Sequence, residues 1–277
     1  MNVKHIFNEL EKADPEIYER VNTRRGAMQQ FSGIAGKLAL AAVPLALGSL
    51  FKKAYGRQNQ TDLFGILNYA LTLEYLEAGF YQMGLAANGL VPAGAPNMAI
   101  QTIGNHETAH VNFLKSAITA AGGMPVNKPT FDFTAGGAFS NVFSNYATFL
   151  AVAQTFEDTG VRAYKGQAAQ ASLMANNDVL TAALNIHSVE ARHASHIRQM
   201  RKANNFGDVK PWITGKESGI GAAVQASYDG EELTSQAGVE IVNINGRNIS
   251  ANAASEAFDE PLSMNEVLAI VDPFIVG

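Results

Sequence analysis

The sequence has no cysteine among its 277 residues. This absence excludes disulfides, thiolate zinc sites, iron–sulfur clusters and cysteine nucleophiles. The strong metal ligands that remain are histidine imidazoles and carboxylates. Any metal ion held by this chain is therefore bound through nitrogen and oxygen atoms.

Charge is scarce as well. Charged residues make up 16% of the chain, against roughly 25% in average soluble domains, and hydrophobic residues make up 47%. The formal net charge is −5 at pH 7. Beyond residue 57, lysine and arginine are scattered except in residues 192–202, so there is no continuous basic track that could neutralise phosphates. Nucleic acid is not an expected partner.

The apolar run near the amino terminus is too short for an ordinary membrane-spanning helix, which needs about 20 residues. It extends from about Leu38 to Phe51, and Arg24 and Arg25 precede it. A twin arginine before a moderately apolar run is similar to an export signal for folded proteins. We expect residues 1–56 to be such a signal, with no stable transmembrane span, and the protein to lie in the periplasm or cell envelope. A cytoplasmic amphipathic helix is the alternative.

Apolar residues recur at three- and four-residue spacing through the middle of the chain, which predicts four long helices. We expect them at about residues 61–89, 97–121, 142–174 and 179–203. The second and third are joined by about 18 residues, enough to run back along the bundle at about 3.3 Å per extended residue. This wiring predicts an all-α four-helix bundle with one long crossover, in which the second and third helices are parallel.

The predicted bundle domain covers residues 57–206, and a mostly irregular extension, residues 207–277, follows it. In this extension we expect a hairpin that turns at Asn245 and Gly246 and a short final helix capped by Ser263. The apolar residues of the extension favour packing on the bundle or on a neighbouring subunit.

The chain has two Glu-x-x-His sequences, Glu107 with His110 and Glu190 with His193. Residues three apart lie on the same face of a helix, so each pair can point in one direction. One such pair is most often a solvated surface pair. Here, however, both residues of the second pair follow those of the first by 83 positions.

The same offset of 83 relates Glu74 to Glu157 and Tyr81 to Tyr164. The bundle is therefore predicted to be a duplicated two-helix hairpin, in which each half supplies one helix with Glu-x6-Tyr and one with Glu-x-x-His. Glu77 would be an alternative to Glu74, but its counterpart is Gly160. We therefore favour Glu74 and expect Glu77 beside the ligands or on the surface.

Four carboxylates and two imidazoles suit two divalent metal ions. Each ion would take one histidine, one terminal carboxylate and shared bridging carboxylates, which leaves positions for water, oxygen or peroxide. Two divalent cations would also balance four glutamate charges in a bundle core. The predicted ligands are Glu74, Glu107, His110, Glu157, Glu190 and His193.

Residues 61–204 resemble the ferritin-like superfamily of di-metal carboxylate proteins, whose pattern is a Glu from each of two helices and Glu-x-x-His from each of two others. The stretches "LNYALTLEYLEAGFY", "HETAHVNFL" and "AFDEPLSMNEVL" are most similar to exported bacterial ferritin-like proteins sometimes called desiccation-related. The resemblance implies two iron or manganese ions held by the six ligands. It places Tyr81 and Tyr164 where such sites often have a redox-capable or hydrogen-bonding tyrosine; ordinary core packing is the alternative for both.

The function that this resemblance implies is an oxidoreductase that reacts with oxygen or hydrogen peroxide, as a ferroxidase, a peroxidase or a catalase-like enzyme, in a possible homodimer. Iron storage, or a metal-binding or stress-protective role at the cell envelope without turnover, are the alternatives. A remote alternative is a zinc metalloprotease, because "HETAH" matches His-Glu-x-x-His through His106 and His110. The offset does not relate His106, His187 or His196 to one another, so we expect these histidines beside the ligands or exposed.

Overall fold

The computed structural model describes residues 60–276. The predicted export signal in residues 1–56 lies outside the described residues and stays a prediction. Within the described range, none of the helices combines the length and the apolar character needed to cross a membrane.

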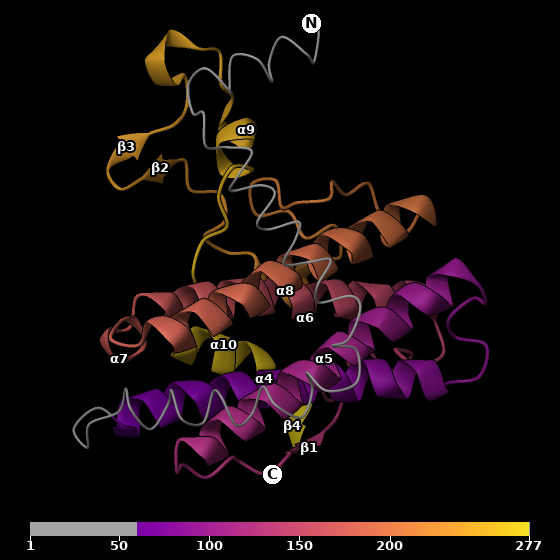
Figure 1. The fold of residues 1–277 in the computed structure, drawn as a ribbon. Helices are drawn as coiled ribbons and strands as arrows, with labels where there is room; N and C mark the ends of the chain where they lie inside the picture. The colour runs from indigo at the N-terminus through magenta and orange to yellow at the C-terminus, as the bar shows by residue number, and fades with distance from the viewer. Residues whose placement is uncertain (1–59, 277) are drawn as a thin grey trace, which may run out of the picture.

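Four long helices form the bundle, as predicted (Figure 1). They are α4 (Gln60–Ala86), α5 (Ala95–Ala120), α6 (Tyr146–Ala168) and α8 (Asn177–Ala203). Helix α4 packs along α5, and α6 packs along α8. The two hairpins expected from the duplication are therefore the two halves of the bundle, and they meet where α4 contacts α6 and α5 contacts α8.

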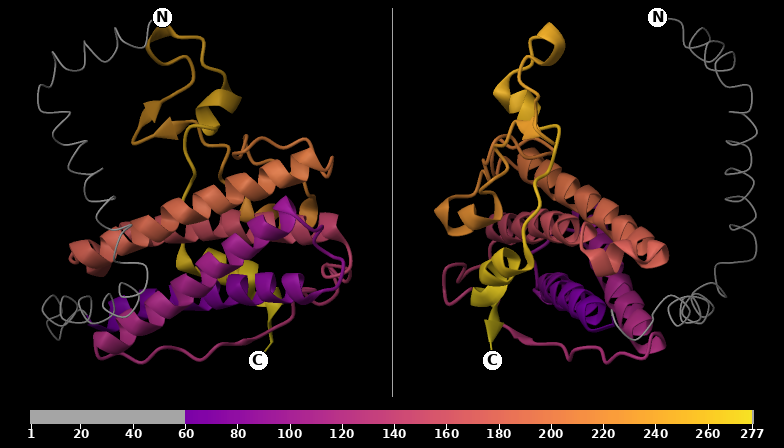
Figure 2. Two further views of the ribbon diagram at one scale, coloured as in Figure 1. Left: turned by 45° about the vertical axis from the view of Figure 1, so that its right-hand side comes forward. Right: turned by 90° about the vertical axis from the view of Figure 1, so that its left-hand side faces the viewer.

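The connection between α5 and α6 runs along the bundle from one end to the other, as Figure 2 shows. Helices α5 and α6 consequently point in the same direction, in agreement with the predicted crossover. The connection contains a two-residue strand, β1 (Thr130–Phe131), which pairs in antiparallel fashion with β4 (Ile275–Val276) near the carboxyl terminus. This pairing of distant segments ties the crossover to the extension.

The prediction of one helix over residues 142–174 is wrong. Residues before Asn145 form turns, and the Asn145 side chain accepts a hydrogen bond of 3.0 Å from the Thr148 N–H, which caps the start of α6. At the other end, Gln170 has an extended backbone (φ −67°, ψ 132°), so the chain leaves the helix and re-enters it as the short α7 (Ala171–Met174).

Two apolar clusters make up the bundle core. One is rich in phenylalanine: the ring of Phe80 stacks on Phe149 at 4.8 Å between centroids and contacts Phe156 edge-on at 5.1 Å. The other cluster is mostly aliphatic. Tyr81 belongs to the first cluster and Tyr164 to the second, so the two sequence-related tyrosines lie in chemically different surroundings.

The extension contains short elements only. They are η1 (Ala222–Ser227), β2 (Ser235–Gln236), β3 (Val239–Glu240), η2 (Ile244–Gly246), α9 (Ala251–Ser255), α10 (Met264–Val271) and η3 (Asp272–Phe274). Ser263 caps the final helix α10 as predicted. In this capping box the Ser263 hydroxyl accepts from the Glu266 N–H, and the Glu266 carboxylate accepts from the Ser263 N–H.

The predicted hairpin turn is wrong in position. Strands β2 and β3 pair, and the turn between them is Ala237 and Gly238, both with positive φ (51° and 80°). Asn245 and Gly246 belong to the 3-10 turn η2 instead. Asn-Gly favours a tight turn by conformational preference, but the preference does not require the flanking residues to pair as strands.

Arginines buried on the outer side of α6 hold the extension to the bundle. Arg162 and Glu231 form an ion pair of 2.7 Å, and both side chains are 1% exposed. The same guanidinium donates hydrogen bonds to the backbone carbonyls of Ser227 (2.7 Å) and Asp229 (2.9 Å). One helix side chain thus satisfies several groups of the extension at once.

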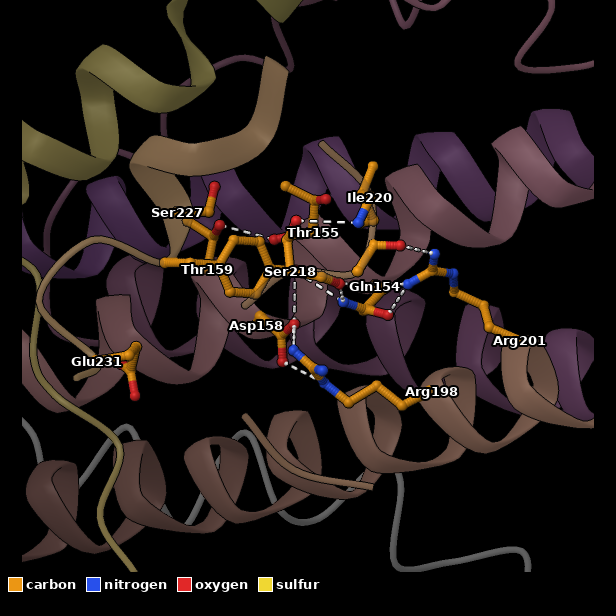
Figure 3. Close-up of polar contacts among 12 residues, drawn as sticks. Gln154, Thr155, Asp158, Thr159, Arg198, Arg201, Ser218, Ile220, Ser227 and Glu231 are labelled. Carbon is orange, nitrogen blue, oxygen red and sulfur yellow. Dashed lines mark hydrogen bonds and ion pairs between the residues drawn. The ribbon is translucent and has the colours of Figure 1, made fainter. Parts of the chain in front are cut away.

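Two further arginines come from α8, and Figure 3 shows their guanidinium groups directed at α6. Arg198 pairs with Asp158, whose second contact is a 2.7 Å hydrogen bond donated by the Tyr228 hydroxyl. Arg201 donates to the Gln154 side-chain oxygen and to the extension's Gly219 carbonyl at 2.7 Å. Because these groups are buried, their hydrogen bonds replace water that they lost on folding.

Replacement of Arg162 by methionine tests this attachment. Arg162→Met leaves the buried Glu231 carboxylate unpaired, so we expect the free energy of unfolding, measured by urea denaturation, to fall by about 3–5 kcal/mol. The double variant Arg162→Met/Glu231→Met removes both charges and should regain a large part of that loss.

The control is the exposed pair Lys216–Glu232, whose side chains are 49% and 46% exposed. Lys216→Met should cost less than about 1 kcal/mol. Equal, small losses for Arg162→Met and Lys216→Met would show that the buried pair does not hold the extension.

Candidate metal centre

The six predicted ligand residues converge inside the bundle. Helices α4 and α6 contribute one glutamate each, and α5 and α8 contribute a glutamate and a histidine each, because residues three apart share a helix face. All four glutamates have 0% exposure. The residues brought together are Glu74, Glu107, His110, Glu157, Glu190 and His193.

The donor atoms fall into two overlapping groups. One group consists of Glu74, Glu107, His110 and Glu190, and the other of Glu107, Glu157, Glu190 and His193; within each group the donor atoms lie within 4.8 Å of one another. Glu107 and Glu190 belong to both groups. The arrangement has the symmetry that the 83-residue offset implies, with one terminal glutamate and one histidine on each side of two shared carboxylates.

The spacing of the donor atoms suits a metal ion. His110 Nδ1 lies 3.1 Å from a Glu74 oxygen and 3.0 Å from a Glu107 oxygen. His193 Nδ1 lies 2.8 Å from Glu107 and 3.2 Å from Glu157. Neighbouring donors around one divalent ion, each about 2.0–2.2 Å from it, are themselves about 3 Å apart.

Glu190 is the ligand carboxylate with the fewest hydrogen bonds. Both of its carboxylate oxygens are buried, and neither has a hydrogen-bond partner among the described residues. Oε1 lies 3.3 Å from His110 Nδ1. A buried carboxylate without hydrogen bonds is costly unless a positive charge compensates it. The residues present therefore fit a divalent metal ion.

The two tyrosines cross over between the halves. The Tyr81 hydroxyl, on α4, donates a 2.5 Å hydrogen bond to Glu157 on α6, and the Tyr164 hydroxyl, on α6, donates to Glu74 on α4. Burial, and then the charge of the carboxylate that each contacts, raises the pKa of both tyrosines well above the usual range. Both hydroxyls therefore keep their protons at neutral pH and orient the terminal carboxylates.

Protons are shared unequally within the cluster. Burial raises the pKa of Glu74 to about 7, and burial together with the charge of Glu107 raises that of Glu190 well above its usual range. Burial would also raise the pKa of Glu107, but hydrogen bonds from His110 and His193 lower it to about 2. Burial opposes the charged form of His193, yet Glu157 and Glu107 outweigh it and raise its pKa to about 10.

Glu77 is a fifth core glutamate, and of its two expected placements the structure has the one beside the ligands and not the one on the surface. It is 3% exposed, and its pKa lies well above the usual range because of burial and then the charge of Glu190. A Cβ atom on Gly160 would lie 3.1 Å from oxygens of both Glu77 and Glu190. Gly160, the counterpart of Glu77 in the duplication, therefore leaves the space that Glu77 occupies. Glu77 belongs to neither donor group.

His106 contacts the centre from outside. Its Nδ1 lies 2.9 Å from His193 Nε2, the nitrogen opposite the one that faces the carboxylates, and the two rings stack at 5.2 Å. His106 is exposed and belongs to neither donor group, so the structure does not assemble the zinc site of a His-Glu-x-x-His protease from His106 and His110. The offset could not reveal this contact, because the counterpart of His106 is Val189.

The remaining candidate histidines lie apart from the donor groups. His196 is exposed, and His187 is partly buried, with a pKa lowered first by burial. The exposure of His196 agrees with the expectation drawn from the offset.

Comparison with known proteins agrees with the fold. The family model described as "Ferritin-like domain" matches residues 62–203, which is half of the chain and covers all six predicted ligands. No curated protein matches the sequence. The chain belongs to the ferritin-like domain family.

Proposed function

We propose that this protein binds two divalent metal ions, iron or manganese, and is an oxidoreductase whose oxidant is dioxygen or hydrogen peroxide. The observation that carries the proposal is the pair of donor groups that share Glu107 and Glu190. In the proposed centre Glu74 and His110 hold one ion, and Glu157 and His193 hold the other. The bound pair supplies two one-electron centres side by side.

The chain's own residues orient and complete this centre. Tyr81 and Tyr164 each fix one oxygen of a terminal carboxylate, which leaves the other oxygen for an ion. His106, by its contact with Nε2, holds the ring of His193 with Nδ1 toward the carboxylates. One histidine, one terminal carboxylate and two shared carboxylates per ion leave room for an oxygen-containing ligand.

The proposed reaction is a two-electron reduction of the oxidant. With iron as substrate, two ferrous ions give up one electron each, and dioxygen takes these two electrons and two protons to become hydrogen peroxide. With hydrogen peroxide as oxidant, two electrons and two protons give two molecules of water. Glu77, which belongs to neither donor group and whose pKa is raised by burial, holds a proton inside the bundle near neutral pH.

Removal of the shared carboxylates tests the activity. We expect the full chain to oxidise ferrous ions with dioxygen or peroxide faster than the ions react in buffer, and Glu107→Gln/Glu190→Gln to fall to the buffer rate, because each substitution removes a ligand from both groups. Stopped-flow absorbance of ferric ions is the measurement. Glu217→Gln/Glu232→Gln, on exposed glutamates, is the control.

Equal rates for the control and the Glu107→Gln/Glu190→Gln variant would remove the oxidoreductase proposal. If the unaltered protein binds metal but does not turn over, only the metal-binding part of the proposal would remain.

The stability gained from metal should grow with pH. In the metal-free protein the pKa of Glu74 is about 7, so Glu74 keeps its proton at pH values at which the unfolded chain has lost it. His193, with a pKa of about 10, does likewise. Because the native state then binds more protons than the unfolded state, the free energy of unfolding falls as pH rises from about 4.5 through about 10. Metal ligation needs these groups deprotonated, so metal affinity rises over the same range.

We therefore expect the increase in Tm on adding Mn²⁺ to be larger at pH 8 than at pH 5.5. At a Mn²⁺ concentration of 100 times Kd the stabilisation should be about 2.7 kcal/mol for each ion bound. Differential scanning calorimetry of the loaded and chelator-treated protein measures it, and the Glu107→Gln/Glu190→Gln variant should show no increase. An increase in Tm that is the same at both pH values would contradict ligation by these residues.

Loss of either crossed tyrosine should weaken metal binding. Tyr81→Phe and Tyr164→Phe each free a terminal carboxylate from its hydrogen bond, and removing such a partner typically costs about 10–100-fold in metal affinity. Calorimetric titration with Mn²⁺ measures the change. Tyr75→Phe is the matched control, because Tyr75 is also buried on α4 but its hydroxyl faces the Val126 carbonyl at 3.4 Å. Unchanged affinity in both test variants would leave the tyrosines with core packing alone.

A further inference from the structure

A small cavity lies in the bundle beside the proposed centre. Its volume is about 30 Å³, and residues of α4, α5, α6, α7 and α8 line it. Leu73 and Ala70 precede Glu74 by one residue and by about one turn, and Ile186 precedes Glu190 by about one turn. Tyr164 forms part of the wall and donates its hydrogen bond to Glu74. One side chain therefore separates the cavity from a proposed ligand.

The cavity exists because the two halves of the duplication differ in side-chain size. On the Tyr81 side, three phenylalanines fill the corresponding space and are buried. At four of the lining positions, the side chain beside the cavity is smaller than its counterpart 83 residues away. The pairs are Phe80 with Ala163, Phe149 with Ile66, Phe156 with Leu73, and Ile100 with Ala183.

The lining suits an apolar molecule. Of the fifteen lining residues in the described chain, only Tyr69, Tyr164 and Gln167 carry polar side-chain atoms. The Tyr164 hydroxyl is already bound to Glu74, and the Tyr69 hydroxyl is the one lining hydroxyl with no hydrogen-bond partner among the described residues. A buried water needs two to four polar partners, and an apolar cavity that offers fewer of them stays dry. Hydrogen peroxide, with two hydroxyl groups, has the same need as water. Dioxygen has none.

The volume limits the occupant to a very small molecule. A cavity needs roughly 10–15 Å³ to hold one water molecule. A volume of about 30 Å³ therefore accommodates a molecule of two heavy atoms and not an aliphatic chain. We propose that this cavity is a dioxygen subsite, and that dioxygen is the oxidant that the centre uses. This inference rests on the proposed function and selects one of its two oxidants.

Xenon, an apolar atom of similar size, is the probe for the cavity itself. Xenon NMR of the metal-free full chain should show saturable binding. Ala163→Leu places a larger side chain in the cavity, as Phe80 does at the related position, and should abolish xenon binding. Ala183→Ile, which copies Ile100, is a second variant in case the first does not fold. Ile118→Val is the control, because Ile118 is also a core residue of the bundle, with 0% exposure, but does not line the cavity.

The oxidants are then compared by stopped flow with ferrous ions, once with dioxygen and once with peroxide under nitrogen. We expect the variants that lose xenon to slow the dioxygen reaction several-fold and to leave the peroxide reaction unchanged, while Ile118→Val changes neither. Absence of xenon binding by the unaltered protein would overturn the inference. So would a xenon-free variant with an unchanged dioxygen rate, or one that slows both oxidants equally.

The two proposals fail in different ways. If the unaltered protein reacts with peroxide alone, the dioxygen subsite is wrong and the proposed function stands. If it reacts with neither oxidant although xenon binds, the proposed function is wrong, and the dioxygen assignment fails with it.

Discussion

The burial of glutamate side chains at the middle of an apolar bundle is the constraint to which the rest of the molecule responds. An unpaired buried carboxylate costs several kcal/mol, and the ligand set contains four with no exposure. Two imidazoles and two tyrosine hydroxyls offset part of this cost in the metal-free state, and the raised pKa values of Glu74 and Glu190 show the remainder. Two divalent cations would remove it, and their binding would therefore be coupled to the protonation of these groups and to stability.

The duplication explains the geometry of the centre, and the departures from it indicate where chemistry can differ between the two sides. Glu77 faces Gly160, so one side has an additional carboxylate. His106 supports His193, while the corresponding place beside His110 has Val189. The phenylalanines near Tyr81 have small counterparts near Tyr164. Two ions bound here would therefore differ in the carboxylates near them, in the hydrogen bonding of their histidine ligands and in their access to a small apolar molecule.

The residues of the centre could be predicted from the sequence because they obey a fixed offset of 83 positions and a three-residue helical spacing. Both regularities can be read from the residue numbers alone. What the sequence could not show depends on contacts between distant segments. Strand β1 exists only because β4 pairs with it, and α6 and α7 separate at Gln170 although the apolar pattern continues. The partners of Arg162 come from residues more than 60 positions away. His106 could not be placed either, because its contact breaks the symmetry that identified the other residues.

The extension and the centre are mechanically connected through α6 and α8. Asp158 follows Glu157 directly, and it is held on the outer side by Arg198 and Tyr228. Arg198 in turn lies five residues after His193 on α8. Since neighbouring helix residues point in different directions, fixing Asp158 outward also fixes the rotation that points Glu157 inward. The extension therefore helps to hold Glu157 in position from outside the bundle. We expect that loss of its contacts with α6 increases the distances between the donor atoms while the bundle stays folded.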